Sequence, residues 1–220
     1  MSQADFSRAR ANMVDGQLRP NRITDKALLA AFAAVPRELF VPPAQRGVAY
    51  ADETVLLGQG REMMAPLTLA HLLQGLGLAE NSHVLVVAAA TGYSAAVAAL
   101  VAGKVVMVED NKRYLTAAKN TLLDLNIANV RTLHAAPEAG APRHAPFDAV
   151  LLDAPAAVIP AALIAQLKDG GKLAAVRVGA DGVPEATIYT KHGKTLFDET
   201  LFETHGHVLA NFQQAEGFVF

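Results

Sequence analysis

A glutamate at the end of a short apolar run is the residue of this chain best placed to do chemistry. Glu109 closes the run Val105 to Val108, and it lies 21 positions after Ala88. A carboxylate at about this spacing in a nucleotide-binding fold accepts both hydroxyl protons of a ribose. We therefore predict that Glu109 binds a ribose. The alternative is a solvated acid that caps a helix starting near Asn111.

The turn that should face such a nucleotide is rich in alanine. It reads Ala88-Ala89-Ala90-Thr91-Gly92. Glycine is favoured in such a turn, because it adopts left-handed φ angles and leaves room for ligand beside the backbone. An alanine at positive φ costs about 1 to 2 kcal/mol and brings a Cβ atom toward the ligand. The alternative is that the alanines only pack a tight junction between a strand and a helix.

The elements that position these residues alternate between strands and helices from about His83 onward. This order indicates an α/β fold with a mostly parallel, doubly wound sheet. The expected strands are His83 to Val87, Val105 to Val108, Val130 to Leu133, Phe147 to Leu152 and Lys172 to Val178. The expected helices are Tyr93 to Ala102, Lys112 to Leu125 and Pro160 to Leu167. An antiparallel C-terminal hairpin, Ala186 to Thr190 with Thr195 to Leu201, should extend the sheet edge.

The first 80 residues have a different pattern, which predicts a helical N-terminal extension with loops. Its expected helices are Ser7 to Leu18, Asp25 to Ala34 with Thr24 as the N-cap, and Leu67 to Leu76 after Pro66. We expect residues 81–220 to form one compact α/β unit onto which this extension packs.

Composition limits the classes of function. With 220 residues and 52% hydrophobic content, the chain can bury one good core. Its net charge is −2 and it has no long basic run, so we expect no nucleic-acid partner. It has no cysteine, which excludes disulfides and thiolate chemistry. The sequence contains neither the apolar core of a signal peptide nor a long apolar stretch, so we expect a cytoplasmic protein that does not enter membranes.

Several blocks together resemble the protein-L-isoaspartate O-methyltransferase family. They are MVDGQLRPNRITDKALLAAFAAVPRELFVP, VLVVAAATGYSAAVAAL, VVMVE and PFDAVLLDAPAAVIPAALIAQLKDGG, and the similarity runs to about Gly179. The resemblance implies a Rossmann-like methyltransferase fold and S-adenosylmethionine as cofactor. It also implies transfer of a methyl group to the carboxylate of an isoaspartyl residue in a damaged protein. The acceptor is then a protein or peptide carboxylate, or a small molecule if the substrate has changed.

The resemblance also locates the cofactor turn, where this chain departs from the family. The family pattern E-I-G-T-G-S-G-Y aligns with residues 86–93, so the first acid and two of three glycines are absent. Ala88, Ala90 and Gly92 would face the methionine end of the cofactor. If the lost glycine limits binding, Ala90→Gly should strengthen it. The family's G-D-G near the adenine aligns with residues 135–137, Ala-Ala-Pro, and either Glu138 or Asp153 could replace the lost acid.

The acceptor loop of the family aligns with residues 58–66. Its pattern G-H-G-Q-T-I-S-Q-P reads here Gly-Gln-Gly-Arg-Glu-Met-Met-Ala-Pro, so the serine beside the reacting carboxylate has become Met64. The resemblance implies that five residues contact the acceptor: Gly60, Arg61, Met63, Met64 and Pro66. The methionines predict a more apolar or adaptable acceptor pocket. Arg61 could reach an acidic group; the alternative is a solvated surface arginine.

The expected reaction does not require a general base. A carboxylate nucleophile is already ionised at pH 7, so positioning in a dry site supplies most of the acceleration. The sequence therefore names no catalytic residue. Asp153 ends the fourth expected strand, in the crevice where open α/β sheets bind ligands. We count it as a cofactor-binding candidate, and a loop-capping aspartate is the alternative.

Other functions stay open. The lost motif residues also fit a binding or assembly module that has retained the scaffold without turnover. A nicotinamide-dinucleotide protein would use Glu109 as well, but the turn lacks the glycine spacing that lets a pyrophosphate approach the helix. His205 and His207, with Glu203 nearby, could share one face of a strand, yet the sequence predicts no further ligand, so we expect no metal site.

Overall fold

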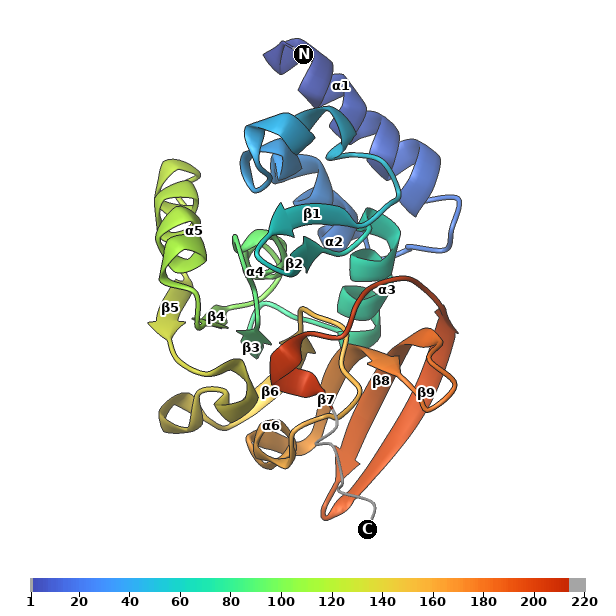
Figure 1. Cartoon of the computed structure of the whole chain (residues 1–220), viewed down its shortest axis with the longest axis vertical. Helices are drawn as coiled ribbons and strands as arrows, with labels where there is room; N and C mark the ends of the chain where they lie inside the picture. The colour runs from blue at the N-terminus through green and yellow to red at the C-terminus, as the bar shows by residue number, and fades with distance from the viewer. Residues whose placement is uncertain (1, 214–220) are drawn as a thin grey trace.

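The first strand of the main sheet lies between two layers of the fold, and its apolar side chains point in turn to one layer and to the other (Figure 1). The computed structural model describes residues 2–213. Val84 and Val86 point into one hydrophobic cluster, and Leu85 and Val87 point into the other. A strand buried on both faces has no polar face to alternate with, which explains its continuous apolar run.

The main sheet has seven strands in the order β5-β4-β3-β6-β7-β8-β9. Its strands are β3 (His83–Val87), β4 (Lys104–Glu109), β5 (Val130–His134), β6 (Phe147–Leu152), β7 (Leu167–Val178), β8 (Pro184–His192) and β9 (Thr195–Glu203). The first five are parallel, while β8 and β9 add an antiparallel hairpin at one edge. The predicted fold class is therefore confirmed, including the C-terminal hairpin.

Helices cover both faces of this sheet. Side chains of α3 (Pro66–Leu76), α4 (Tyr93–Ala99) and α5 (Lys112–Asp124) belong to the larger cluster. The shorter α6 (Ala161–Ala165) contributes Leu163 to the cluster on the other face. The predicted helices were correct in place; α3 ends at Leu76 as expected, while α4, α5 and α6 end one to three residues earlier than expected.

The N-terminal region contains helices, as expected, but also a hairpin that the sequence did not predict. α1 (Gln3–Met13) continues into a π-helical turn, and α2 (Lys26–Ala34) is capped by Asp25 rather than by Thr24. The strands β1 (Val55–Gly58) and β2 (Arg61–Met63) form their own two-stranded sheet. Strands this short carry too little alternation to be distinguished from a loop.

The extension and the sheet share one core. Met13 and Phe32 from the first two helices belong to the same hydrophobic cluster as Val84 and Tyr93. The extension therefore cannot be removed without exposing apolar surface of the sheet layer, and α2 packs directly on α4.

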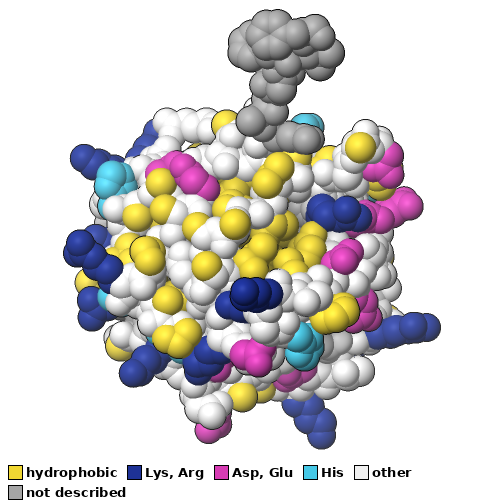
Figure 2. Space-filling view, turned by 90° about the horizontal axis from the view of Figure 1, so that it is seen from below, with side chains coloured by type: hydrophobic (Ala, Val, Ile, Leu, Met, Phe, Trp, Pro, Cys, Tyr) yellow, Lys and Arg dark blue, Asp and Glu magenta, His cyan; other side chains and the backbone are white. Residues whose placement is uncertain are grey.

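The surface agrees with the charge balance of the sequence. Figure 2 shows one face on which separate basic and acidic side chains surround a central hydrophobic area, without a continuous basic area. Within residues 2–213, no helix has the length and apolar character needed to cross a bilayer. The absence of a nucleic-acid partner stays a prediction.

The turn from β3 to α4 keeps a glycine-like path although it consists mostly of alanine. Ala88 and Ala90 have φ angles of 57° and 45°, and Gly92 has a φ of 89°. A Cβ atom on Gly92 would lie 3.0 Å from the Cβ atom of Ala118, so glycine is required there. Both alanines are buried, and their methyl groups belong to the two core clusters. The packing of these methyls offsets part of the backbone strain.

This balance can be measured with two matched substitutions. In Ala90→Gly, relief of about 1 to 2 kcal/mol of strain opposes the loss of about 0.8 kcal/mol for one buried methyl group and the extra freedom of the unfolded chain. We expect its free energy of unfolding to stay within about 1 kcal/mol of the parent. Ala95→Gly, in the right-handed α4, should lose about 2 kcal/mol. Urea denaturation checks this, and equal losses in the two variants would contradict the strain.

Candidate active site

The carboxyl ends of three neighbouring strands bring the predicted site residues together. Val87 of β3 lies in register with Val108 of β4 and with Leu152 of β6. The next residues along the three strands are Ala88, Glu109 and Asp153. This is the edge of an open α/β sheet at which ligands bind, so the predicted crevice exists as expected.

Glu109 is fully buried in this crevice, and Arg61 of the β1–β2 hairpin pairs with it through both carboxylate oxygens. The Arg61 Nη1 atom lies 3.0 Å from Oε1, and Nη2 lies 2.7 Å from Oε2. The backbone N–H groups of Ala90 and Asn111 donate to the same carboxylate at 2.7 and 2.9 Å. These four bonds fill the roughly four lone-pair positions of a carboxylate. Neither a solvated acid nor a free ribose acceptor describes Glu109 in this structure.

Arg61 makes a further contact that holds it across the crevice. Its Nη2 atom also donates to the Ala88 carbonyl at 2.6 Å, and Nη1 lies 3.6 Å from the Asp110 carboxylate. Only 6% of the Arg61 side chain is exposed. The alternative of a solvated surface arginine is therefore wrong. Arg61 binds an acidic group, but that group belongs to its own chain.

The protonation of Glu109 reflects opposing influences. Burial raises the pKa of Glu109, while the Arg61 charge and the N–H donors of Asn111 and Ala90 oppose the rise. A bidentate guanidinium with two backbone donors favours the ionised form. The pair is thus an ion pair whose two partners depend on each other for solvation.

Asp153 forms a second acidic position at the end of β6. The Ser94 hydroxyl donates to its carboxylate in a short hydrogen bond, and its backbone N–H donates to the Val87 carbonyl at 2.9 Å. Burial raises the pKa of Asp153 to about 7, although Ser94, Arg61 and Arg37 all act to lower it. Asp153 also lines the cavity under the β1–β2 hairpin.

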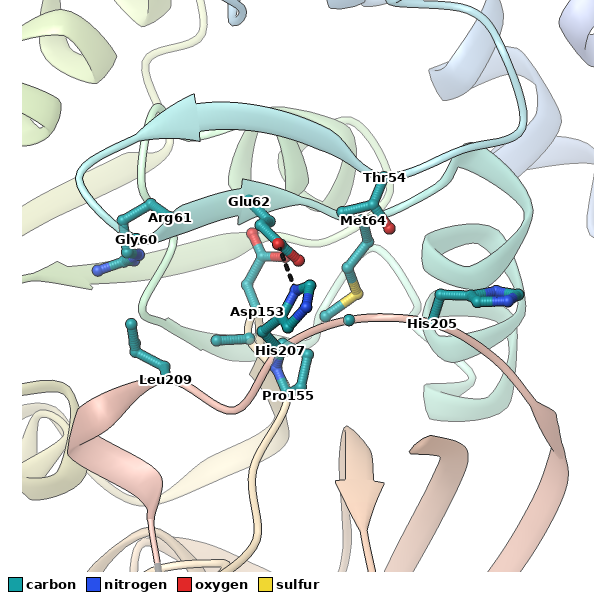
Figure 3. A pocket seen from close by; sticks show the side chains of 12 residues that line it. Thr54, Gly60, Arg61, Glu62, Met64, Asp153, Pro155, His205, His207 and Leu209 are labelled. Carbon is teal, nitrogen blue, oxygen red and sulfur yellow. Dashed lines mark hydrogen bonds and ion pairs between the residues drawn. The ribbon is translucent and has the colours of Figure 1, made fainter. Parts of the chain in front are cut away.

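A small cavity lies below the β1–β2 hairpin (Figure 3). Gly60, Arg61, Met64 and Asp153 are among its lining residues. Its volume of about 20 Å³ has room for about one water molecule. Three of the five predicted acceptor-loop residues thus line one space.

The other two acceptor-loop candidates, Met63 and Pro66, are buried and do not line this cavity. Met63 belongs to the larger core cluster, and Pro66 begins α3. Sequence alone could not separate them from Met64, because alternation along so short a strand is not a usable signal.

The segment after β9 closes the crevice from the other side. In Figure 1 this red segment crosses back over α3 and ends beside β6. His207 contacts Glu62 of β2 at 2.8 Å, and Asn211 donates to the carboxylates of Asp110 and Glu138 at 3.3 and 3.0 Å. Phe212 is buried in the same cluster as Ala88. The sequence predicted none of these contacts.

The histidine pair does not gather further ligands. Figure 3 shows His207 directed to Glu62, while His205 points away from it. Within the described part of the chain, no three His, Cys, Asp or Glu side chains come close enough to hold a metal.

Sequence reasoning also missed Arg37, which is fully buried behind the crevice. Its Nε atom donates to the Ala49 carbonyl at 2.6 Å, and Nη2 donates to the Met64 carbonyl at 2.5 Å. Its guanidinium lies 4.8 Å from the centre of the Tyr93 ring. Arg37 thereby fixes the backbone of the loop that carries Met64. An arginine in a proline-rich stretch gave no signal of this role.

The raised pKa of Asp153 predicts a pH dependence of stability. Because the folded pKa of about 7 exceeds the ordinary 3.8, this carboxyl contributes stability at low pH that is lost as the pH rises through about 7. Asp153→Asn should therefore gain stability relative to the parent between pH 5 and pH 8. Urea titrations at several pH values measure this, with the exposed Asp124→Asn as control. Parallel curves for parent and Asp153→Asn would contradict it.

The buried ion pair predicts a large asymmetry between two arginines. Arg61→Ala leaves the Glu109 carboxylate without its charge partner, which typically costs about 3 to 5 kcal/mol. Arg177→Ala removes a comparable contact, 2.7 Å from Glu185, but in a partly exposed pair, and should cost about 1 kcal/mol or less. Chemical denaturation of both variants makes the comparison. A similar loss in both would mean that the Glu109 pair is solvated.

Comparisons with known proteins identify the fold and its lineage. The family model described as Protein-L-isoaspartate(D-aspartate) O-methyltransferase (PCMT) matches residues 9–205. A Protein-L-isoaspartate O-methyltransferase of Methylorubrum extorquens is 38% identical over 90% of this chain and 86% of its own. One of Aliivibrio fischeri is 35% identical over 89% of this chain and 93% of its own.

Solved structures agree at the level of fold. A protein-L-isoaspartate O-methyltransferase superposes with a TM-score of 0.80 at 24% identity, covering 92% of this chain and 67% of that one. A Plasmodium falciparum chain in complex with S-adenosyl-L-homocysteine superposes with a TM-score of 0.75 at 20% identity, covering 92% and 98%. The sequence resemblance is confirmed: this chain belongs to the protein-L-isoaspartate O-methyltransferase family, whose methyl donor is S-adenosylmethionine.

Proposed function

We propose that this chain is an S-adenosylmethionine-dependent O-methyltransferase whose acceptor is a carboxylate on a protein or peptide. Family membership over residues 9–205 is the observation that carries this proposal. The crevice supports it, because a buried carboxylate ends β4 beside the turn that leads into α4. The relatives are named for action on isoaspartyl protein, and we extend that class of acceptor to this chain.

The donor does not fit the crevice as the residues now stand. All acceptor positions of Glu109 are taken by Arg61, Ala90 and Asn111, so ribose hydroxyls would find no partner. The cavity of about 20 Å³ under the hairpin is lined neither by Glu109 nor by the turn from Ala88 to Gly92, so it offers the donor no space beside them. We infer that this arrangement is a closed state and that catalysis requires a different position of the β1–β2 hairpin.

The protein side chains suggest how an acceptor would be received. Met64 presents an apolar side chain to the cavity at the position where the family's loop has serine. Arg61 is the cation nearest to this space, and Arg37 fixes the Met64 backbone from behind. An acceptor carboxylate would enter a desolvated site and require a charge partner. Arg61, once displaced from Glu109, is the side chain within reach.

Methyl incorporation tests this proposal. Purified protein is incubated with saturating methyl-labelled S-adenosylmethionine and either an isoaspartyl peptide or the same peptide with ordinary aspartate. We expect base-labile label in the isoaspartyl peptide alone, because only that acceptor matches the relatives' named activity. The exposed Arg143→Ala is the control variant and should retain full incorporation.

The contradicting result is equally specific. Absence of label in both peptides, and in a panel of small carboxylic acids, would refute the methyltransferase proposal and favour the alternative of a binding or assembly module. Label in the aspartyl peptide would assign a different acceptor to the same reaction. The cytoplasmic location expected from the sequence stays a prediction.

A further inference from the structure

Arg61 occupies two hydrogen-bond acceptors at the expected donor site. One is the Glu109 carboxylate, which the ribose hydroxyls require. The other is the carbonyl of Ala88, on the turn that would face the methionine end. A single guanidinium therefore spans both ends of the expected donor contact. In the family's acceptor-loop pattern given above, a neutral glutamine aligns with Arg61.

We propose that the β1–β2 hairpin is an autoinhibitory lid and that Arg61 is an internal competitor of S-adenosylmethionine for Glu109. This inference rests on the proposed function, since it concerns regulation of the same donor site. Donor binding requires the hairpin to move until the guanidinium leaves the carboxylate. The apparent affinity for donor is then the intrinsic affinity reduced by the fraction of open molecules.

The attachment of the hairpin is consistent with movement as a unit. β1 and β2 pair only with each other and share no ladder with the seven-stranded sheet. Their connection contains consecutive residues with positive φ, at 95° for Gly58, 50° for Gln59 and 70° for Gly60. An isolated two-stranded hairpin is marginally stable. Its displacement would break no ladder of the main sheet, although the side chains of Val55, Leu57 and Met63 would have to leave the larger core cluster.

Buried apolar side chains and a few polar contacts hold this lid closed: Val55, Leu57 and Met63 belong to the larger core cluster. Besides Arg61, the Tyr114 hydroxyl lies 2.7 Å from the Gly58 carbonyl and 3.2 Å from that of Leu57. The Asn111 side chain donates to Gln59 at 2.6 Å. At the far side, Glu62 contacts His207 at 2.8 Å. These contacts join the lid to α5 and to the segment after β9, and both flank the donor crevice.

Calorimetric titration with S-adenosylhomocysteine tests the lid without depending on turnover. We expect Arg61→Gln to bind at least about tenfold more tightly than the parent, because the closed state loses its bidentate ion pair. Arg143→Ala, an equal loss of charge at the amino end of the strands, should bind like the parent. A merely structural role for Arg61 would leave the affinity unchanged or weaken it.

A second variant covers the case in which Arg61→Gln does not fold. Tyr114→Phe keeps both members of the ion pair and the packing of α5, but removes the hydroxyl that holds the hairpin. It should tighten binding about fivefold, the equivalent of one ordinary hydrogen bond. Equal affinity in the parent, in Tyr114→Phe and in any folded Arg61→Gln would overturn the lid.

These results separate the lid from the proposed function. Tighter binding in Arg61→Gln with no methyl transfer to any acceptor would support the lid and refute the methyltransferase proposal. Methyl transfer by the parent, with the same S-adenosylhomocysteine affinity in parent and variants, would refute the lid and leave the methyltransferase proposal intact.

Discussion

The bidentate pair between Arg61 and Glu109 is the interaction on which the functional end of this molecule depends. The pair joins the β1–β2 hairpin to β4, and two backbone N–H groups donate the remaining hydrogen bonds to the Glu109 carboxylate. Desolvation makes such a pair costly to break on one side only. The same feature therefore stabilises the closed crevice and denies Glu109 to a ligand.

Two different constraints meet at this crevice. The scaffold requirement is a tight, left-handed turn between β3 and α4, and the chain meets it with Ala88, Ala90 and Gly92 rather than with three glycines. The binding requirement is an accessible carboxylate and an open hollow, and the structure does not meet it in its closed form. A methyltransferase fold that has acquired the proposed lid would keep the tight turn and cover the carboxylate.

The sequence was sufficient for the architecture and insufficient for the state of the site. The apolar run at His83 to Val87, the small-residue turn and the acid at Glu109 predicted a doubly wound sheet and the crevice at its carboxyl edge. Those signals are local, so periodicity and spacing capture them. The partner of Glu109 lies 48 positions earlier on a strand of three residues. An ion pair between residues so far apart cannot be predicted from the spacing of residues along the sequence. The resemblance of residues 58–66 to the family's acceptor loop predicted instead that Arg61 contacts the acceptor.

The segment from His207 to Phe212 has a consequence for the order in which the molecule folds. This segment ties Glu62 and Asp110 together across the crevice and buries an aromatic ring against the sheet. The contacts of His207 with Glu62 and of Asn211 with Asp110 join residues that lie 145 and 101 positions apart in the sequence. Because closing such long loops costs chain entropy before the contacts form, we expect this segment to cover the crevice only after the sheet has folded.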